Sequence, residues 1–464
     1  MALTLRGAEV SFLLCDGVLP ACQECDHQWL SEPDFERYGP QRHLCSTCYE
    51  PARAMLAPLG LPILTYGQFL DSTPPSPPPA SLAEHAHAGA LRYYGRGTLP
   101  ETRAARRIAQ RYEAAGERTV AALRGLLEQQ QPDVALFHHG IYIPQGVVGA
   151  VLREAGCRVV NWGLAYRKGT VLVSHDDSYH YTMIDESPSN WEDMAWSAEH
   201  EQTLLSYLRS RWTGGNDWIN FQQDAEIDRA TIVSALDLDP GRPVIGLLTN
   251  VIWDAQLHFR QSAFPSMLEW LFETIQYFIT RPQFQLVIRV HPAEILGTVP
   301  SRQPAADEIA ARFGDLPPHI KIVGPEAKVS TYALMEACDC ALVYGTKTGL
   351  ELACMGMQVV VAGEAWSRGK GFTCDVSTRD EYFSLLGQLP LGSRLQPDRV
   401  LAARKYAYHF FFRRMIPLAF LKPAKRFGPY RLAIDSLDEL LPGRDPGLDI
   451  FCDGVLNGGA FVFS

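Results

Sequence analysis

The second half of the chain alternates short apolar runs with helical patterns, and this alternation constrains the fold more than any other feature of the sequence. The apolar runs are rich in Val, Ile and Leu and cover residues 243–249, 285–290, 320–323, 340–343 and 358–362. Helical spacing of apolar residues lies between them, over 262–280, 305–313, 331–337 and 349–355. Strands that are mostly apolar and separated by helices are typical of a parallel sheet covered on both faces.

Polar residues follow each of the five predicted strands. These dipeptides are Thr249-Asn250, His291-Pro292, Gly324-Pro325, Gly345-Thr346 and Gly363-Glu364. The carboxyl ends of parallel strands meet at one edge of an open sheet, where such sheets bind ligands. We therefore expect one ligand cleft at this edge.

The first half of the chain shows a similar alternation. Strands are predicted over 9–16, 63–69, 134–139, 158–162 and 170–175, and a long helix over 101–130. A chain of 464 residues is long enough for two domains. We predict an α/β protein with two Rossmann-like domains, residues 1–215 and 216–400, that face an interdomain cleft. Residues 401–464 are expected to form a crossover helix and tail.

Composition excludes several classes of function. The net charge is −10, which argues against binding of nucleic acid over the whole surface. No apolar run is long enough to span a bilayer, and the N-terminus lacks the cationic region of a secretory signal. The eleven cysteines are an odd number, which fits a reducing cytoplasm better than a disulfide framework. Neither a Walker A motif nor a Rossmann GxGxxG motif is present, which disfavours ATP hydrolysis and nicotinamide chemistry.

Four cysteines form two CxxC pairs near the N-terminus, Cys22/Cys25 and Cys45/Cys48. The 19 residues between the pairs are typical of a zinc ribbon, so the spacing predicts a structural Zn²⁺ site with four thiolates. An iron–sulfur cluster and free buried thiols are the alternatives. Acidic residues around the cysteines argue against contact with nucleic acid.

Two of the polar strand ends predict a phosphate site. His291 is placed to donate a hydrogen bond or positive charge to a phosphate, although a histidine that merely caps the strand is the alternative. Thr346, Lys347 and Thr348 lie in a loop before a helical pattern, where backbone amides and the helix dipole favour an anion. The alternative is an ordinary helix cap with a surface lysine.

The region 246–383 resembles the GT-B glycosyltransferases that use nucleotide sugars in bacterial capsule polysaccharide synthesis. The resemblance rests on residues 248–255, 289–294, 344–351 and 363–372, and its His-Pro motif also occurs in sialyltransferases and Kdo transferases. It implies a sugar donor linked to CMP or UDP, and transfer to a glycan, lipid-linked or protein acceptor without a catalytic metal. Asn250 and Lys370 are then candidates for donor contacts, and Glu351 for the ribose hydroxyls.

The resemblance also implies a catalytic base in the N-terminal domain. Several histidines and aspartates follow predicted strands there, and of these we select His139 and Asp177. Two rival functions stay open: a nucleotide-sugar epimerase on the same scaffold, and a non-catalytic zinc protein that binds partners.

The segment 404–431 contains eight Lys and Arg residues and no acidic residue, with aromatic residues interleaved. One interpretation is a terminal helix that packs back across both domains. A second is a patch that contacts the inner membrane and meets a lipid-linked acceptor. A third is stacking of its aromatic residues on nucleic acid. The first two fit a cytoplasmic enzyme.

Overall fold

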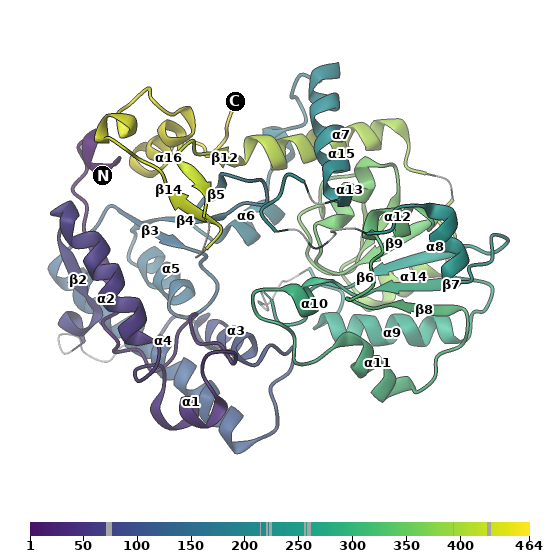
Figure 1. Ribbon diagram of the computed structural model, residues 1–464, viewed down its shortest axis with the longest axis horizontal. Helices are drawn as coiled ribbons and strands as arrows, with labels where there is room; N and C mark the ends of the chain where they lie inside the picture. Colours follow the sequence, from purple (N-terminus) through teal and green to yellow (C-terminus); the bar gives the residue numbers. More distant parts are fainter. Residues whose placement is uncertain are drawn as a thin grey trace.

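The chain folds into two α/β lobes (Figure 1). The computed structural model describes residues 1–70, 77–213, 215–219, 221, 225–254, 257, 261–392, 394–424 and 428–464. The first lobe contains residues 1–184 and 415–464, and the second lobe contains residues 229–408. Helix α7 (Ala198–Thr213) lies between them in the sequence and packs on α15.

The second lobe is built on a six-stranded, fully parallel sheet. Its strands are β6 (Val244–Leu248), β7 (Gln285–Arg289), β8 (Ile320–Val323), β9 (Cys340–Val343), β10 (Gln358–Val361) and β11 (Cys374–Asp375). Their order across the sheet is β11-β10-β9-β6-β7-β8, so the direction of strand addition reverses between β6 and β9. Ligands of doubly wound sheets bind outside the carboxyl ends of the strands at such a reversal.

Helices cover both faces of this sheet. Its central strands carry apolar side chains on both faces, which must be kept from water, and every residue of β6, β7 and β9 is accordingly buried. One face packs on α9 (Met267–Ile279), α11 (Ala305–Phe313) and α14 (Arg379–Leu386). The other packs on α8 (Arg229–Ala235), α12 (Thr331–Glu336) and α13 (Thr348–Cys354). The short helix α10 (Ala293–Leu296) follows β7. The strands and helices predicted for this half are confirmed, most of them to within one or two residues at each end.

The first lobe contains a mixed four-stranded sheet. Its strands are β3 (Val134–His138), β4 (Arg158–Leu164), β5 (Thr170–His175) and β12 (Met415–Pro417), in the order β12-β5-β4-β3. Only β3 and β4 pair in parallel, and β5 is antiparallel to β4. The prediction of a Rossmann-like sheet in this half is therefore only partly right. Five residues separate β4 from β5, too few for the crossover that a parallel pair needs.

The remainder of the first lobe packs around the 27-residue helix α4 (Arg103–Gln129), whose first turn is capped by Thr102. Around it lie the parallel pair β1 (Phe12–Leu14) and β2 (Ile63–Thr65), and the helices α1 (Glu32–Tyr38), α2 (Cys45–Leu56), α3 (Leu82–Tyr94) and α5 (Gln145–Glu154). Helix α6 (Tyr179–Ile184) follows β5 and faces the second lobe.

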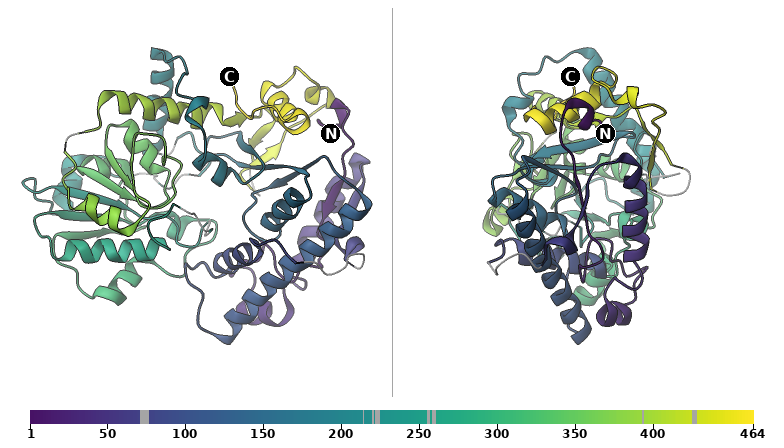
Figure 2. Two further views of the ribbon diagram at one scale, coloured as in Figure 1. Left: turned by 180° about the vertical axis from the view of Figure 1, so that it is seen from behind. Right: turned by 90° about the vertical axis from the view of Figure 1, so that its left-hand side faces the viewer.

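The C-terminal segment crosses back to the first lobe, as Figure 2 shows from behind. Helix α15 (Pro397–Tyr408) packs on α13, and the chain then adds β12 to the sheet of the first lobe. A hairpin of β13 (Leu421–Pro423) and β14 (Tyr430–Leu432) follows, and α16 (Pro446–Asn457) covers the sheet.

Three aromatic residues of the segment 404–431 pack inward along this course, which supports the interpretation of a terminal helix that packs back on the protein. Tyr406, Phe410 and Phe411 are fully buried in a core shared by α7, α13 and α15. They are therefore unavailable for the predicted contact with a membrane, which the structure does not support. No helix in the part of the chain that the structure describes is long and apolar enough to cross a bilayer.

The predicted metal site is not supported either. Among the described residues, no three His, Cys, Asp or Glu side chains are grouped so that they could hold a metal ion. The Sγ atoms of Cys22 and Cys25 are 3.9 Å apart, with Cys25 buried in the core beside Phe35. Cys45 and Cys48 instead begin α2, a helix without buried residues, and Cys48 is exposed. The thiols of Cys45 and Cys48 interact electrostatically with Cys22, so the two pairs are neighbours, but they are not grouped as metal ligands.

Candidate functional site

A cavity of about 780 Å³ lies between the two lobes, at the carboxyl ends of β6, β7 and β9. This is the edge of the second sheet at which the polar strand ends predict a ligand. The second lobe contributes the predicted donor-binding residues Asn250, His291, Thr346, Lys347 and Thr348. The first lobe contributes His139, Tyr166, Tyr179 and His180.

His291 follows β7, and its ring is held in one tautomer. The backbone N–H of Ala293 donates to its Nδ1 at 3.0 Å, so the neutral ring carries its proton on Nε2. Its own backbone N–H donates to the hydroxyl of Thr249 at 3.0 Å, which fixes the turn. Burial, and the nearby cations Lys347 and Arg289, lower the pKa of His291 to about 4. At neutral pH, His291 is therefore an uncharged donor through Nε2 at the cavity wall.

Thr346 lies in the loop after β9, and Thr348 is the first residue of α13. The hydroxyl of Thr346 donates to that of Thr348 at 3.3 Å and accepts from the Thr348 backbone N–H at 3.4 Å. Across the loop from them, Asn250 follows β6, and its Oδ1 is buried without a hydrogen-bond partner among the described residues. A buried, unpaired carbonyl oxygen is costly unless a ligand satisfies it.

Lys347 lies in the same loop and faces the cavity. Its ammonium donates to Glu351 at 3.0 Å and lies 4.6 Å from the centre of the Tyr166 ring. Burial and the like charge of Arg211 lower the pKa of Lys347 to about 8, and Glu351 opposes this shift. With Arg211 and Arg289, Lys347 makes this wall of the cavity rich in cations. Such a wall favours an anionic ligand.

Glu351 does not take the place that the resemblance implies for it. Its side chain is 1% exposed and lies behind Lys347, outside the lining of the cavity. It accepts hydrogen bonds from Tyr332 and Lys347 and pairs with Arg211. All of its contacts are therefore internal, and a ribose in the cavity does not reach it.

The opposite wall of the cavity carries His139. This residue directly follows β3 and has a φ of 70°, a left-handed conformation that is rare for a side chain of this size. Its Nδ1 is buried without a hydrogen-bond partner among the described residues. Burial, His180 and His138 lower the pKa of His139 to about 3, while the carboxylate of Asp254 acts in the opposite direction. The ring is therefore neutral at pH 7 and faces a cavity that also contains a carboxylate.

Two of the predicted site residues lie outside this cavity. Asp177 accepts a hydrogen bond from the backbone N–H of Ser178 at 2.6 Å and does not line the cavity. Lys370 is buried outside the lining of the cavity, and its Nζ donates to the carbonyl of Ile184 at the end of α6 at 2.6 Å. The Lys370 ammonium is therefore hydrogen-bonded within the protein, and the structure does not support a contact between Lys370 and the donor.

Other residues of the cavity were missed from the sequence. Arg211 comes from α7 and His180 from α6. Asp254, which lines the cavity, accepts a hydrogen bond from Tyr142 at 3.1 Å, and this bond links the loop after β3 to the loop after β6. No local pattern marks these residues. Tyr142 and Asp254 pair only when the two lobes come together, whereas Arg211 pairs both with Asp217, six residues later, and with the distant Glu351.

No model of a known protein family matches the sequence, and no curated protein matches it. Among solved structures, the fold is similar to KpsC of Thermosulfurimonas dismutans, a β-Kdo 2,4-transferase, with a TM-score of 0.37 and 14% identity over 60% of this chain and 80% of that chain. A UDP-GlcNAc 2-epimerase from Neisseria meningitidis bound to UDP-GlcNAc gives a TM-score of 0.27 and 13% identity over 64% of this chain and 76% of that chain. A family 9 glycosyltransferase from Veillonella parvula gives a TM-score of 0.24 and 11% identity, over 41% of this chain and 55% of that chain. These similarities are remote, so the function must be argued from the residues of the cavity.

Proposed function

We propose that this protein is a glycosyltransferase, which moves a sugar from a nucleotide donor to an acceptor hydroxyl in the cavity between the lobes. The observation that carries the proposal is the wall formed by His291, Thr346, Lys347 and Thr348 at the reversal of the second sheet. It combines a fixed neutral N–H donor, two hydroxyls and a cation around one space. These groups suit the phosphate of a nucleotide sugar, whose negative charge grows as the nucleotide departs.

The donor is placed with its phosphate against this wall and its sugar toward the first lobe. The acceptor oxygen attacks the anomeric carbon, while the bond from that carbon to the phosphate oxygen breaks. The nucleotide leaves with the bonding electrons, and His291 and Lys347 stabilise the charge that develops on it. Asn250 offers its buried Oδ1 to a hydroxyl or amino group of the donor.

His139 is our candidate for the base that takes the proton of the acceptor hydroxyl. It lines the same cavity as His291, and its Nδ1 has no hydrogen-bond partner among the described residues. The pKa of its ring must rise for this step. The carboxylate of Asp254 acts in that direction, and so does the negative charge of a bound phosphate. No metal ion is needed for this step.

The finer assignments are also proposals, and they rest on the resemblance of residues 246–383 to capsule glycosyltransferases. They are a donor linked to CMP or UDP, an acceptor that is a glycan, a lipid-linked sugar or a protein, and a role in bacterial surface polysaccharide synthesis in the cytoplasm. The net charge of −10 supports a partner other than nucleic acid.

A thermal-shift screen with CMP, UDP, GDP and their sugars tests the proposal, because a ligand that binds only the folded state raises the melting temperature. The nucleotide sugar that gives a shift is then incubated with the enzyme, with and without glycan acceptors. Release of nucleotide that depends on an acceptor is the expected result. Isomerisation of the sugar without any acceptor would identify an epimerase instead.

A further inference from the structure

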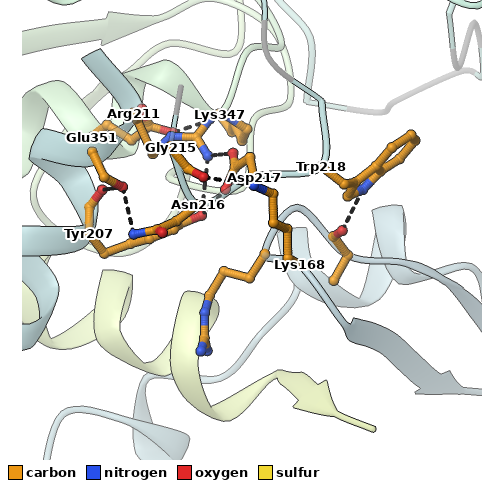
Figure 3. A network of polar contacts seen from close by, with 12 residues as sticks. Lys168, Tyr207, Arg211, Gly215, Asn216, Asp217, Trp218, Lys347 and Glu351 are labelled. Carbon is orange, nitrogen blue, oxygen red and sulfur yellow. Dashed lines mark hydrogen bonds and ion pairs between the residues drawn. The ribbon is translucent and has the colours of Figure 1, made fainter. Parts of the chain in front are cut away.

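The segment that joins the two lobes is itself part of the wall of the cavity. Residues 215–219 follow α7 and dock on the turn between β4 and β5 of the first lobe (Figure 3). The backbone N–H of Lys168 donates to the carbonyl of Asn216 at 3.2 Å, and the Lys168 ammonium donates to that of Gly215 at 2.8 Å. The indole of Trp218 donates to the carbonyl of Ala165 at 2.7 Å. These bonds fix the linker to the first lobe.

Arg211, near the end of α7, connects this linker to the second lobe. Its guanidinium pairs with the carboxylate of Asp217 in the linker, which also accepts a hydrogen bond from Tyr207 at 2.7 Å. The Nε of Arg211 lies 3.2 Å from Oε1 of Glu351 on α13. The side chains of Arg211, Asp217 and Glu351 are each less than 10% exposed. One buried arginine therefore bridges carboxylates from two parts of the chain.

The same oxygen of Glu351 also holds Lys347. The Lys347 ammonium lies 3.0 Å from Oε1, the atom that faces Arg211, while the hydroxyl of Tyr332 donates to Oε2. Arg211 and Lys347 thus share one carboxylate oxygen, and both line the cavity. A carboxylate shared by two cations holds each of them less tightly than it would hold one alone. Lys347 is therefore kept in place but remains able to turn toward an anion in the cavity.

We propose that Arg211 is a positioning residue of the donor site, which sets the position and charge of Lys347 through Glu351 and links both to the docked linker. This inference rests on the proposed function, because it assigns to Lys347 the phosphate of the nucleotide donor. It also gives Glu351 a role in orienting Lys347 in place of the ribose contact.

The charged and titratable groups around Lys347 determine how its affinity for a phosphate depends on pH. They are Glu351 on α13, Arg211 on α7, Asp217 in the linker, Tyr166 after β4, Tyr332 on α12, and Arg289 and His291 at the end of β7. Arg211 lowers the pKa of Lys347 and Glu351 raises it. Removal of the arginine and removal of the carboxylate must therefore shift the titration of Lys347 in opposite directions.

The test is the affinity of the full-length protein for CMP and UDP, measured by calorimetry from pH 6 to pH 9. In the wild type we expect the affinity to fall as the pH rises through about 8. In Arg211→Met the midpoint of this fall in affinity moves to higher pH. The affinity of this variant at pH 7 is lower by roughly tenfold, which is the effect of one charge-assisted contact. In Glu351→Gln the midpoint moves to lower pH. Arg209→Met removes an exposed arginine from the same helix and serves as the matched control, with no expected change.

Arg211→Lys covers the case in which Arg211→Met fails to fold. It keeps the charge, but a single ammonium does not reproduce the planar fork that spans Asp217 and Glu351. We expect weaker binding with an unchanged midpoint. The inference is overturned if the Arg211 variants bind like Arg209→Met, or if the Arg211→Met and Glu351→Gln midpoints move in the same direction. A wild-type protein that binds neither nucleotide would refute the proposed function and the inference together.

Discussion

Replacement of His291 by alanine tests the donor site at its best-defined atom. The ring is fixed by the Ala293 N–H on Nδ1, so the substitution removes an N–H donor whose direction is known. A hydrogen bond to a charged phosphate oxygen contributes about 1.5–3 kcal/mol. That range corresponds to a loss of affinity of about 10-fold to 150-fold. The lost bond from Ala293 destabilises the fold by about 1 kcal/mol, which leaves the protein folded at room temperature.

The assay is isothermal titration of CMP and UDP into wild-type and variant protein at pH 6, 7 and 8. Because burial and the nearby cations lower the pKa of His291 to about 4, the ring is neutral throughout this range. The loss on substitution should therefore be the same at all three pH values. His291→Gln, whose amide N–H lies near the position of Nε2, should recover part of the affinity. His43→Ala, which removes an exposed histidine, should bind like the wild type.

Two results would refute the reasoning. An affinity of His291→Ala within a factor of two of the wild type would place the phosphate away from this residue. A loss that grows steadily as the pH falls from 8 to 6 would show that the imidazolium, and not the neutral ring, contacts the phosphate.

Three further predictions concern other parts of the molecule. His139→Ala should lower kcat by about 10²-fold to 10⁴-fold in a steady-state assay, as loss of a general base does, with little change in nucleotide affinity. Asp177→Asn, a substitution outside the cavity, should leave kcat unchanged, and equal effects of the two substitutions would argue against His139 as the base. Lys347→Met should remove the fall in nucleotide affinity above pH 8, because the substitution removes the ammonium whose pKa is about 8. If calorimetric titration of this variant still shows the fall, another group is responsible for it. Because Phe410 is fully buried, Phe410→Ala should lower the free energy of unfolding by about 3–5 kcal/mol in urea denaturation. Phe412 is a half-buried neighbour, and a loss as small as that of Phe412→Ala would contradict the place of Phe410 in the core.

The second lobe could be predicted well from the sequence because its pattern is local. The strands Ile320–Val323 and Cys340–Val343 and the helix Ala305–Phe313 have the predicted bounds, since a buried strand and an amphipathic helix each show their periodicity within a few residues. The positions of His291 and of the loop 345–349 at the edge of the sheet were predictable for the same reason, because both directly follow such strands.

The first lobe was harder because its structure depends on contacts between distant segments. Strand β5 is antiparallel, and this follows from a short turn that the apolar pattern does not reveal. Strand β12 joins the same sheet from more than 230 residues later in the chain. Pairing over such a distance leaves no periodic pattern in the sequence.

Charged residues were the least predictable part of the site. Glu351 has the sequence position of a ligand contact, but its side chain is turned toward Arg211, 140 residues earlier in the chain. Four cysteines at ribbon spacing predicted a metal site, but their thiols are not grouped as metal ligands although the two pairs interact electrostatically. For Glu351 the outcome depends on a partner from another segment.

A crystal structure with CMP or UDP bound tests the central claim most directly. The account predicts a phosphate oxygen within hydrogen-bonding distance of His291 Nε2 and of the Thr346 or Thr348 hydroxyl, with Lys347 turned toward it. A nucleotide bound outside the cavity, or one with its phosphate on the His139 side, would contradict the account.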